Sequence, residues 1–243
     1  MRKLLKQSSA LVNLIEALRQ IPFDVRRALW SMRRDSDIRR YFESHAVRKL
    51  QIGSGYNMLE GWLNADFNPS TRQPGQIYLN ATHRFPFPDE SIDYVFSEHM
   101  IEHIWWPDGQ TMLKESNRIL RPGGRIRIST PNLESIVSLL DQPLTPLKEQ
   151  YIKLSTDKYI PHAIDYQPGF VINNFFWDFG HYFVYDTKTL ELALRTAGFT
   201  DITCCKPMQS GDTNLIGTES HQKIVGDRVN AFESIIMEGV KKA

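Results

Sequence analysis

The stretch that most constrains the fold is residues 50–67, LQIGSGYNMLEGWLNADF. Two short apolar runs flank a turn that contains Gly53 and Gly55, and the second run ends on Asp66. Glycine accepts φ > 0 and lets a ligand approach the backbone closely. A carboxylate at the end of a strand can accept both hydroxyls of a ribose. The stretch therefore predicts a nucleoside pocket at the carboxyl edge of a parallel sheet, with a tight loop and a solvated acid as the alternative.

The glycine spacing indicates which kind of nucleoside fits. A dinucleotide fingerprint needs a third glycine where this chain has Met58, and a helix whose N-terminus receives the pyrophosphate. The two apolar runs are separated by about nine residues, fewer than the dozen or so of a helical crossover. We therefore expect a loop in place of the first helix, and a ligand that has a ribose but no pyrophosphate.

The following sequence alternates between strand and helix patterns, which is typical of a parallel sheet covered on both sides. The fold class it predicts is α/β, with a doubly wound, seven-stranded and mostly parallel sheet. After the two strands of residues 50–67, further strands are expected at 77–79, 92–96, 125–130, 199–205 and 235–240, and helices at 107–120, 132–140, 187–197 and 224–232.

The N-terminal segment, residues 1–48, is predicted to be a helical cap in front of a domain spanning residues 49–243. Residues 3–20 place leucines on one helical face, Pro22 interrupts the pattern, and residues 24–44 form a second helix or pair of helices. Residues 1–50 hold twelve Lys/Arg and five Asp/Glu, a net charge of +7, which leaves −6 for the rest. This basic run has four interpretations: a solvated face, an anionic substrate or carrier, a membrane surface, or a partner subunit, which leaves a homodimer open.

Residues 141–186 interrupt the alternation and are interpreted as an inserted lid. Eleven of the 27 aromatic residues of the chain lie between residues 151 and 185. Long insertions in compact domains are usually lids or binding loops. A small separate core under the loop is the alternative.

Composition and cysteine usage narrow the class of protein. The total charge of +1 argues against binding of nucleic acid by the whole chain. Cys204 and Cys205 are adjacent and have no other partner, so a disulfide framework is excluded and a cytoplasmic protein is expected. No run approaches the ~18 apolar residues of a membrane span, and we expect no secretion signal.

Four blocks of the sequence, in this order, resemble the class I S-adenosylmethionine-dependent methyltransferases: LQIGSGYN…NADF, LNATHRFPFPDESIDYVFSEHMIEHI, LRPGGRIRISTPN and TLELALRTAGFTDI. The resemblance implies a Rossmann-like fold with an antiparallel last strand, and S-adenosylmethionine as the cofactor. It further implies that Asp66 holds the ribose hydroxyls. The other implied cofactor residues are Gly53, Ser54 and Gly55 beside the methionine moiety, Asn80 and Ala81 beside the adenine, and Ser97 and Glu98 facing the sulfonium. Ser54 stands where the family often has Cys, and Asn80 where it commonly has Asp.

Methyl transfer from a sulfonium is an in-line displacement, and a hydroxyl acceptor needs a base. His181 is our first candidate for that base and His162 the second, with a structural role as the alternative for each. The expected acceptor is a small molecule or a saccharide, because flat aromatic side chains can pack against an apolar ring or a sugar face. The aromatic residues proposed for this are Tyr159, Tyr166, Phe170, Phe175, Phe176, Trp177 and Tyr182. A non-catalytic scaffold subunit and a nicotinamide-dependent oxidoreductase are the alternative functions.

A second motif, His99-Met100-Ile101-Glu102-His103, matches the H-x-x-E-H arrangement of some zinc peptidases. It directly follows the predicted fourth strand, and the methyltransferase resemblance covers the same residues. We therefore expect no metal ion, and interpret His103 as a packing histidine and His99 as a residue at the edge of the pocket.

Overall fold

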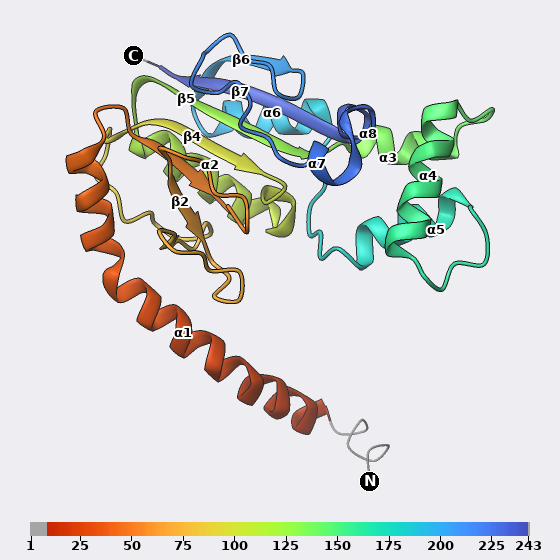
Figure 1. The fold of residues 1–243 in the computed structure, drawn as a ribbon, viewed down its shortest axis with the longest axis horizontal. Helices are drawn as coiled ribbons and strands as arrows, with labels where there is room; N and C mark the ends of the chain where they lie inside the picture. Colours follow the sequence, from red (N-terminus) through yellow and green to blue (C-terminus); the bar gives the residue numbers. More distant parts are fainter. Residues whose placement is uncertain (1–8, 243) are drawn as a thin grey trace.

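The computed structural model describes the backbone of residues 9–242 and the side chains of residues 21–242. Its centre is a seven-stranded sheet in the order β3-β2-β1-β4-β5-β7-β6 (Figure 1). β7 runs antiparallel to β5 and β6, and the other neighbouring pairs are parallel, which confirms the predicted sheet. The strands are β1 (Lys49–Ile52), β2 (Leu63–Asp66), β3 (Ile77–Tyr78), β4 (Ile92–Glu98), β5 (Leu120–Pro131), β6 (Phe199–Cys205) and β7 (Ser234–Lys241).

The order of the strands determines where a ligand can bind. The chain moves outward from β1 to β3, and then crosses to β4 on the other side of β1, so Leu50 pairs with both Leu63 and Val95. Such a reversal opens a crevice at the carboxyl ends of the central strands. Residues 53–62, between β1 and β2, contain no helix, as the short spacing predicted.

The two faces of the sheet are covered differently. Helices α2 (Trp106–Ile119) and α6 (Thr187–Thr196) pack with Ile126 and Ile128 of β5 in the main hydrophobic core. Because side chains alternate along a strand, Arg127 points to the opposite face. There it is fully buried and forms ion pairs with Glu219 and Glu238. The loop of residues 206–221 supplies much of the cover on this second face.

The N-terminal segment differs from the prediction. Residues 9–44 form one helix, α1 (Ser9–Ser44), which continues through Pro22. Proline removes one intrahelical hydrogen bond, but the helix is maintained on both sides of it. α1 packs beside β3, where the Trp30 indole donates a hydrogen bond of 2.9 Å to the Gln76 carbonyl. It therefore lies against the β3 side of the sheet rather than over its carboxyl edge. Leu4 and Leu5, part of the predicted first helix, lie outside the described residues.

Residues 141–185 lie beyond the carboxyl end of β5 and the amino end of β7 (Figure 1). They contain α4 (Pro146–Tyr159) and α5 (Pro168–Trp177), which pack on the short elements around them. Buried residues of the insertion form a core of their own with Val225 and Val229. The surrounding elements are α3 (Leu133–Val137), η3 (Ser138–Leu140), α7 (Gln222–Val225) and α8 (Asp227–Glu233). The separate core considered for this segment is thus present, and the inner side of the insertion also borders a cavity. No helix in the described part of the chain is long and apolar enough to cross a membrane.

Candidate active site

A cavity of about 500 Å³ opens at the carboxyl ends of β1, β2 and β4. Four of the eight predicted cofactor residues line it: Gly53, Asp66, Asn80 and Ala81. The remaining walls come from Ile52, Phe67, Asn68, Leu79, Thr82, His99, Met100, His103 and Ile104. The strand-turn-strand-acid stretch thus forms one side of a cavity at the predicted edge of the sheet.

Asp66 organises the turn on this side of the cavity. Its two carboxylate oxygens accept hydrogen bonds of 2.7 Å from the backbone N–H groups of Gly55 and Asn68. Each oxygen can accept a further hydrogen bond, so the carboxylate can still receive the hydroxyls of a ribose. Gly53 has a φ of 72°, and a Cβ atom at this position would lie 2.4 Å from the Met100 side chain. A side chain at residue 53 would therefore be strained and would clash with the wall of the cavity.

The other four predicted cofactor residues do not line the cavity. The Gly55 N–H donates a hydrogen bond to the Asp66 carboxylate, and Gly55 itself lies behind the residues that line the cavity. The Ser54 hydroxyl is buried between the Ala65 carbonyl and the Gln76 amide. Ser97 is buried within β4. Glu98 is turned toward the loop before α7, where its carboxylate accepts hydrogen bonds from the backbone of residues 220 and 221 and from the Ser220 hydroxyl.

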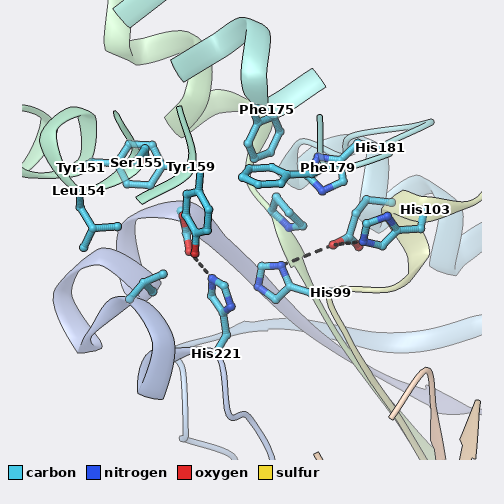
Figure 2. A pocket seen from close by; sticks show the side chains of 14 residues that line it. His99, His103, Tyr151, Leu154, Ser155, Tyr159, Phe175, Phe179, His181 and His221 are labelled. Carbon is cyan, nitrogen blue, oxygen red and sulfur yellow. Dashed lines mark hydrogen bonds and ion pairs between the residues drawn. The ribbon is translucent and has the colours of Figure 1, made fainter. Parts of the chain in front are cut away.

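A second cavity, of about 250 Å³, lies between the edge of the sheet and the inner side of the insertion. Figure 2 shows aromatic rings of α4 and α5 on one side of it, with His181 beside Phe175, and the imidazoles of His99 and His221 on the other. Of the seven aromatic residues expected to contact an acceptor, Tyr159 and Phe175 line this cavity. The full lining is His99, Glu102, His103, Pro131, Tyr151, Leu154, Ser155, Tyr159, Phe175, Phe179, His181, His221, Val225 and Glu233.

His99 and His103 line both cavities. His99 has a φ of 45°, an uncommon value for a residue other than glycine, and it turns the chain from β4 into the short helix η2 (Ile101–His103). The prediction that His99 lies at the edge of the pocket is therefore confirmed. The prediction that His103 is a packing histidine is wrong, because its side chain is 41% exposed and faces both cavities.

Two imidazoles of the second cavity, those of His99 and His221, are each paired with a carboxylate. His99 Nδ1 lies 3.4 Å from Oε1 of the fully buried Glu102, whose other oxygen accepts a hydrogen bond from Thr130. Burial disfavours the charge on both groups, but their mutual attraction outweighs it, so the pKa of His99 is raised and that of Glu102 is lowered. His221 pairs through Nε2 with Glu233. The rings of His99 and His221 are 4.0 Å apart, which joins the two pairs.

His181, our first candidate for a general base, lines the second cavity. Burial lowers its pKa to about 4, which keeps the imidazole neutral at neutral pH. Its Nδ1 atom is buried without a hydrogen-bond partner among the described residues. His162, the second candidate, is exposed and is absent from the lining of the cavity. The structure thus brings one of the two predicted histidines to the site.

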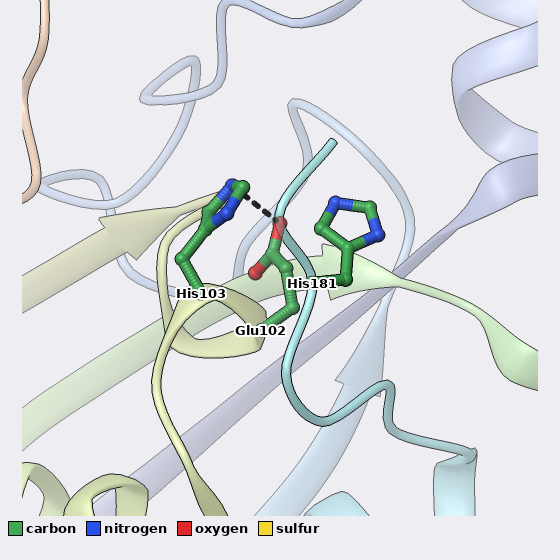
Figure 3. A group of neighbouring side chains, drawn as sticks. All are labelled: Glu102, His103 and His181. Atoms are coloured by element: carbon green, nitrogen blue, oxygen red, sulfur yellow. Dashed lines mark ion pairs between the residues drawn. The ribbon is translucent and has the colours of Figure 1, made fainter. Parts of the chain in front are cut away.

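Figure 3 shows a group of three potential metal ligands, Glu102, His103 and His181. One ligand atom of each residue lies within 4.8 Å of those of the other two. Glu102 Oε1 and His103 Nε2 are 4.0 Å apart. Ligand atoms around a tetrahedral zinc ion lie about 3.4 Å from one another, given metal–ligand distances near 2.1 Å. The group is therefore wider than a formed zinc site. His103 Nδ1 is also engaged, at 3.2 Å from the Gly180 carbonyl. That no metal ion takes part stays a prediction.

Among the lining residues that were not found from the sequence, three are titratable: Tyr151, His221 and Glu233. They lie in α4, before α7 and at the end of α8, all far from β4 in the chain. No local spacing relates them, so a single sequence offers no signal for their proximity. The H-x-x-E-H spacing, by contrast, did mark His99, Glu102 and His103, which the resemblance led us to treat as edge and packing residues.

Comparison with known proteins gives the following matches. Residues 55–128 match the family described as a methyltransferase domain. A probable S-adenosylmethionine-dependent methyltransferase of Mycolicibacterium smegmatis is 43% identical over 61 residues, which is 25% of this chain and 23% of that protein. A probable S-adenosylmethionine-dependent methyltransferase of Mycobacterium tuberculosis is 35% identical over 86 residues, 35% of this chain and 29% of that protein. The matches thus span less than a third of the length of these relatives.

Among solved structures, an S-adenosylmethionine-dependent methyltransferase from Archaeoglobus fulgidus is 19% identical, with 93% of this chain and 99% of that chain covered and a TM-score of 0.48. Phosphoethanolamine N-methyltransferase 2 of Haemonchus contortus is 16% identical, with 81% and 49% covered and a TM-score of 0.44. At these scores the structural similarities add nothing to the sequence matches.

Proposed function

Because the chain belongs to the class I S-adenosylmethionine-dependent methyltransferase family, we propose that it transfers a methyl group from S-adenosylmethionine to a hydroxyl of a small molecule or saccharide. One observation carries this proposal: His99 and His103 line both the cavity beside Asp66 and the aromatic cavity under the insertion. Two cavities that share a wall can bring a donor and an acceptor together, and alignment at close range is the main requirement of a methyl transfer.

The larger cavity suits the cofactor. Its volume of about 500 Å³ falls in the range of pockets for small ligands, about 300–1,000 Å³. Asp66 would hold the ribose, Gly53 would let the methionine part approach the backbone, and Asn80 with Ala81 would border the adenine. With residues 53–62 free of helix, the cavity has no helix N-terminus for a pyrophosphate, which disfavours a nicotinamide dinucleotide.

The smaller cavity suits the part of the acceptor that reacts. A volume of about 250 Å³ fits one sugar or aromatic ring rather than a polymer segment. Tyr151, Tyr159, Phe175 and Phe179 offer ring faces against which such a group can pack. No Lys or Arg is present in its lining, so we place a neutral group in it. We place no nucleic-acid strand in it, because such a strand is bound along an extended groove with successive stacking rings.

The bound cofactor supplies an electrophilic methyl group at its sulfonium, and the chain must remove the proton of the acceptor hydroxyl. We assign this to Nδ1 of His181, which carries no other hydrogen bond among the described residues. The imidazolium formed would be stabilised by the nearby carboxylate of Glu102. His221, oriented by Glu233, supplies a further polar group for a second hydroxyl of the acceptor. Free Cys204 and Cys205 support the cytoplasm as the compartment.

The test is incubation with methyl-labelled S-adenosylmethionine and a panel of sugars and aromatic alcohols. We expect transfer to at least one acceptor, loss of most of kcat in His181→Asn, and an unchanged cofactor Kd in that variant. His162→Asn is the matched control and should retain full activity, because His162 is exposed and outside both cavities. Cofactor binding without turnover on any acceptor would support the scaffold function instead. Equal loss of activity in both variants would contradict the assignment of His181.

A further inference from the structure

Followed from its end toward its start, α1 runs from the amino ends of the strands to the cofactor side of the sheet. Close to the end of the helix, the Tyr41 hydroxyl is hydrogen-bonded to backbone groups at the start of β1. About three turns earlier, the Trp30 indole donates to the Gln76 carbonyl just before β3. One turn before that, Arg27 contacts Phe67, which directly follows the carboxyl end of β2. α1 therefore reaches the edge of the sheet at which the larger cavity opens.

Arg27 holds Phe67 by both its ring and its backbone. The guanidinium carbon lies 3.7 Å from the centroid of the Phe67 ring, and Nε donates a hydrogen bond of 3.4 Å to the Phe67 carbonyl. Arginine stacks on an aromatic face through its planar guanidinium. The arginine is itself fixed, because Nη1 forms an ion pair of 3.1 Å with Asp24 and only 19% of the side chain is exposed. Since Trp30 anchors the next turn of α1, the guanidinium has a defined position beside the cavity.

Phe67 needs such a contact, because its own surroundings do not fix it. It opens the loop of residues 67–76, which contains neither helix nor strand, and it is 39% exposed. The Tyr78 ring, at 5.9 Å between centroids, is its neighbour on the sheet side. Phe67 also lines the larger cavity, directly after Asp66. A nucleoside whose ribose is held by Asp66 would therefore contact Phe67, and the position of that ring depends on what packs against its face.

We propose that Arg27 is a positioning residue for the cofactor site: by stacking on Phe67 it keeps this ring in the wall against which the adenosine of S-adenosylmethionine packs. This role rests on the proposed assignment of the larger cavity to the cofactor. Arg27 precedes the segment that matches the methyltransferase family, residues 55–128, so α1 contributes to the site from outside that segment. The planar face of Arg27 is what matters and not its charge, because S-adenosylmethionine itself carries a net positive charge at neutral pH and a nearby cation repels it.

The first test is calorimetric titration of the full chain with S-adenosylmethionine and with uncharged S-adenosylhomocysteine. Arg27→Ala and Arg27→Lys should each raise both Kd values by about 3- to 10-fold, because neither side chain stacks as a plane on Phe67. The matched control is Arg26→Ala, which removes the same charge from the neighbouring exposed residue and should leave both Kd values unchanged. Unchanged binding in Arg27→Ala, or an equal loss in Arg26→Ala, would refute the role of Arg27. A parent protein that binds neither ligand would refute the assignment of the cavity, and this role with it.

The second test asks whether Arg27 acts through Phe67. Phe67→Leu removes the ring and keeps an apolar side chain, and the Kd of S-adenosylmethionine is compared for Arg27→Ala, Phe67→Leu and the double variant. We expect the double variant to bind as Phe67→Leu does, within about twofold, because without the ring the guanidinium has nothing to position. Effects of the two substitutions that multiply would show that Arg27 acts elsewhere, through the packing of α1, and would overturn the proposal. The melting temperature of Arg27→Ala should remain close to that of Arg26→Ala.

Discussion

Replacement of Asp66 by alanine removes both the proposed and the observed role of this carboxylate. The proposed role is ligand binding, since the two oxygens each have capacity for a ribose hydroxyl. The other is the turn, because the same oxygens accept backbone hydrogen bonds of 2.7 Å from Gly55 and Asn68. Hydrogen bonds to a charged group contribute about 1.5–3 kcal/mol. We therefore expect Asp66→Ala to weaken S-adenosylmethionine binding by about 1.5–3 kcal/mol, about 10- to 150-fold in Kd.

The measurement is isothermal titration calorimetry, with chemical unfolding of the same samples. The strand that carries Asp66 also offers a matched control. Asn64 holds the other end of the same loop, since its Oδ1 accepts from the Leu59 N–H and its Nδ2 donates to the carbonyls of Leu59 and Trp62. It does not line the cofactor cavity. Asn64→Ala should therefore lower the free energy of unfolding by about 1–3 kcal/mol and change the cofactor Kd by less than about threefold.

The comparison of the two variants decides the role of Asp66. If Asn64→Ala weakens cofactor binding as much as Asp66→Ala, the carboxylate acts through the shape of the loop and does not hold the ribose. If the parent protein binds NAD tightly and S-adenosylmethionine not at all, the assignment of the cavity is wrong altogether.

Three further predictions concern the base, the buried ion pairs and metal ions. Because burial lowers the pKa of His181 to about 4, kcat should stay level as the pH falls from 8 to about 5 and decline only as the imidazole becomes protonated near pH 4; a decline centred near 6.5 would indicate another histidine. Arg127→Ala leaves Glu219 and Glu238 without their buried cation and should lower the free energy of unfolding by about 3–5 kcal/mol in urea titrations. Its control, Arg195→Ala, removes an exposed ion pair and should lower the free energy of unfolding by only about 0–1 kcal/mol. Dialysis against EDTA should leave methyl transfer unchanged, and recovery of a lost activity by added zinc would contradict this.

The cofactor side of the site was predictable because its determinants are local. Gly53 and Asp66 are 13 residues apart in adjoining β1–β2 segments, and parallel strands end at the same edge of a sheet. The prediction was less accurate at the end of β4. Glu98 was expected to face the sulfonium, but its carboxylate contacts the loop before α7. The next residue, His99, has a left-handed backbone and its side chain faces the cavities. The φ angle of His99 at the end of β4 is not determined by the local sequence.

The helix break predicted at Pro22 fails for a different reason. Proline removes one intrahelical hydrogen bond and so lowers the stability of a helix locally, but the flanking turns keep their own hydrogen bonds and α1 remains continuous from Ser9 to Ser44. The sequence also did not indicate which face of this helix packs on the sheet. The structure places Trp30 against the Gln76 carbonyl and leaves Val25 and Met32 exposed.

The second cavity, proposed to hold the acceptor, could not be built from sequence, because its walls come from segments far apart in the chain. His99 and Glu102 follow β4, Tyr151 and Phe175 belong to the insertion, and Glu233 ends α8. Helices α4 and α5 of the insertion pack on a core of their own with residues of α7 and α8, and only its end, at Phe183 and Tyr185, joins the main core. Changes in its inner aromatic residues can therefore alter the acceptor without disturbing the β1–β2 turn that is proposed to hold the cofactor. The segment that matches the methyltransferase family, residues 55–128, thus contributes His99, Glu102 and His103 to the second cavity, whereas the aromatic residues proposed to contact the acceptor lie outside it.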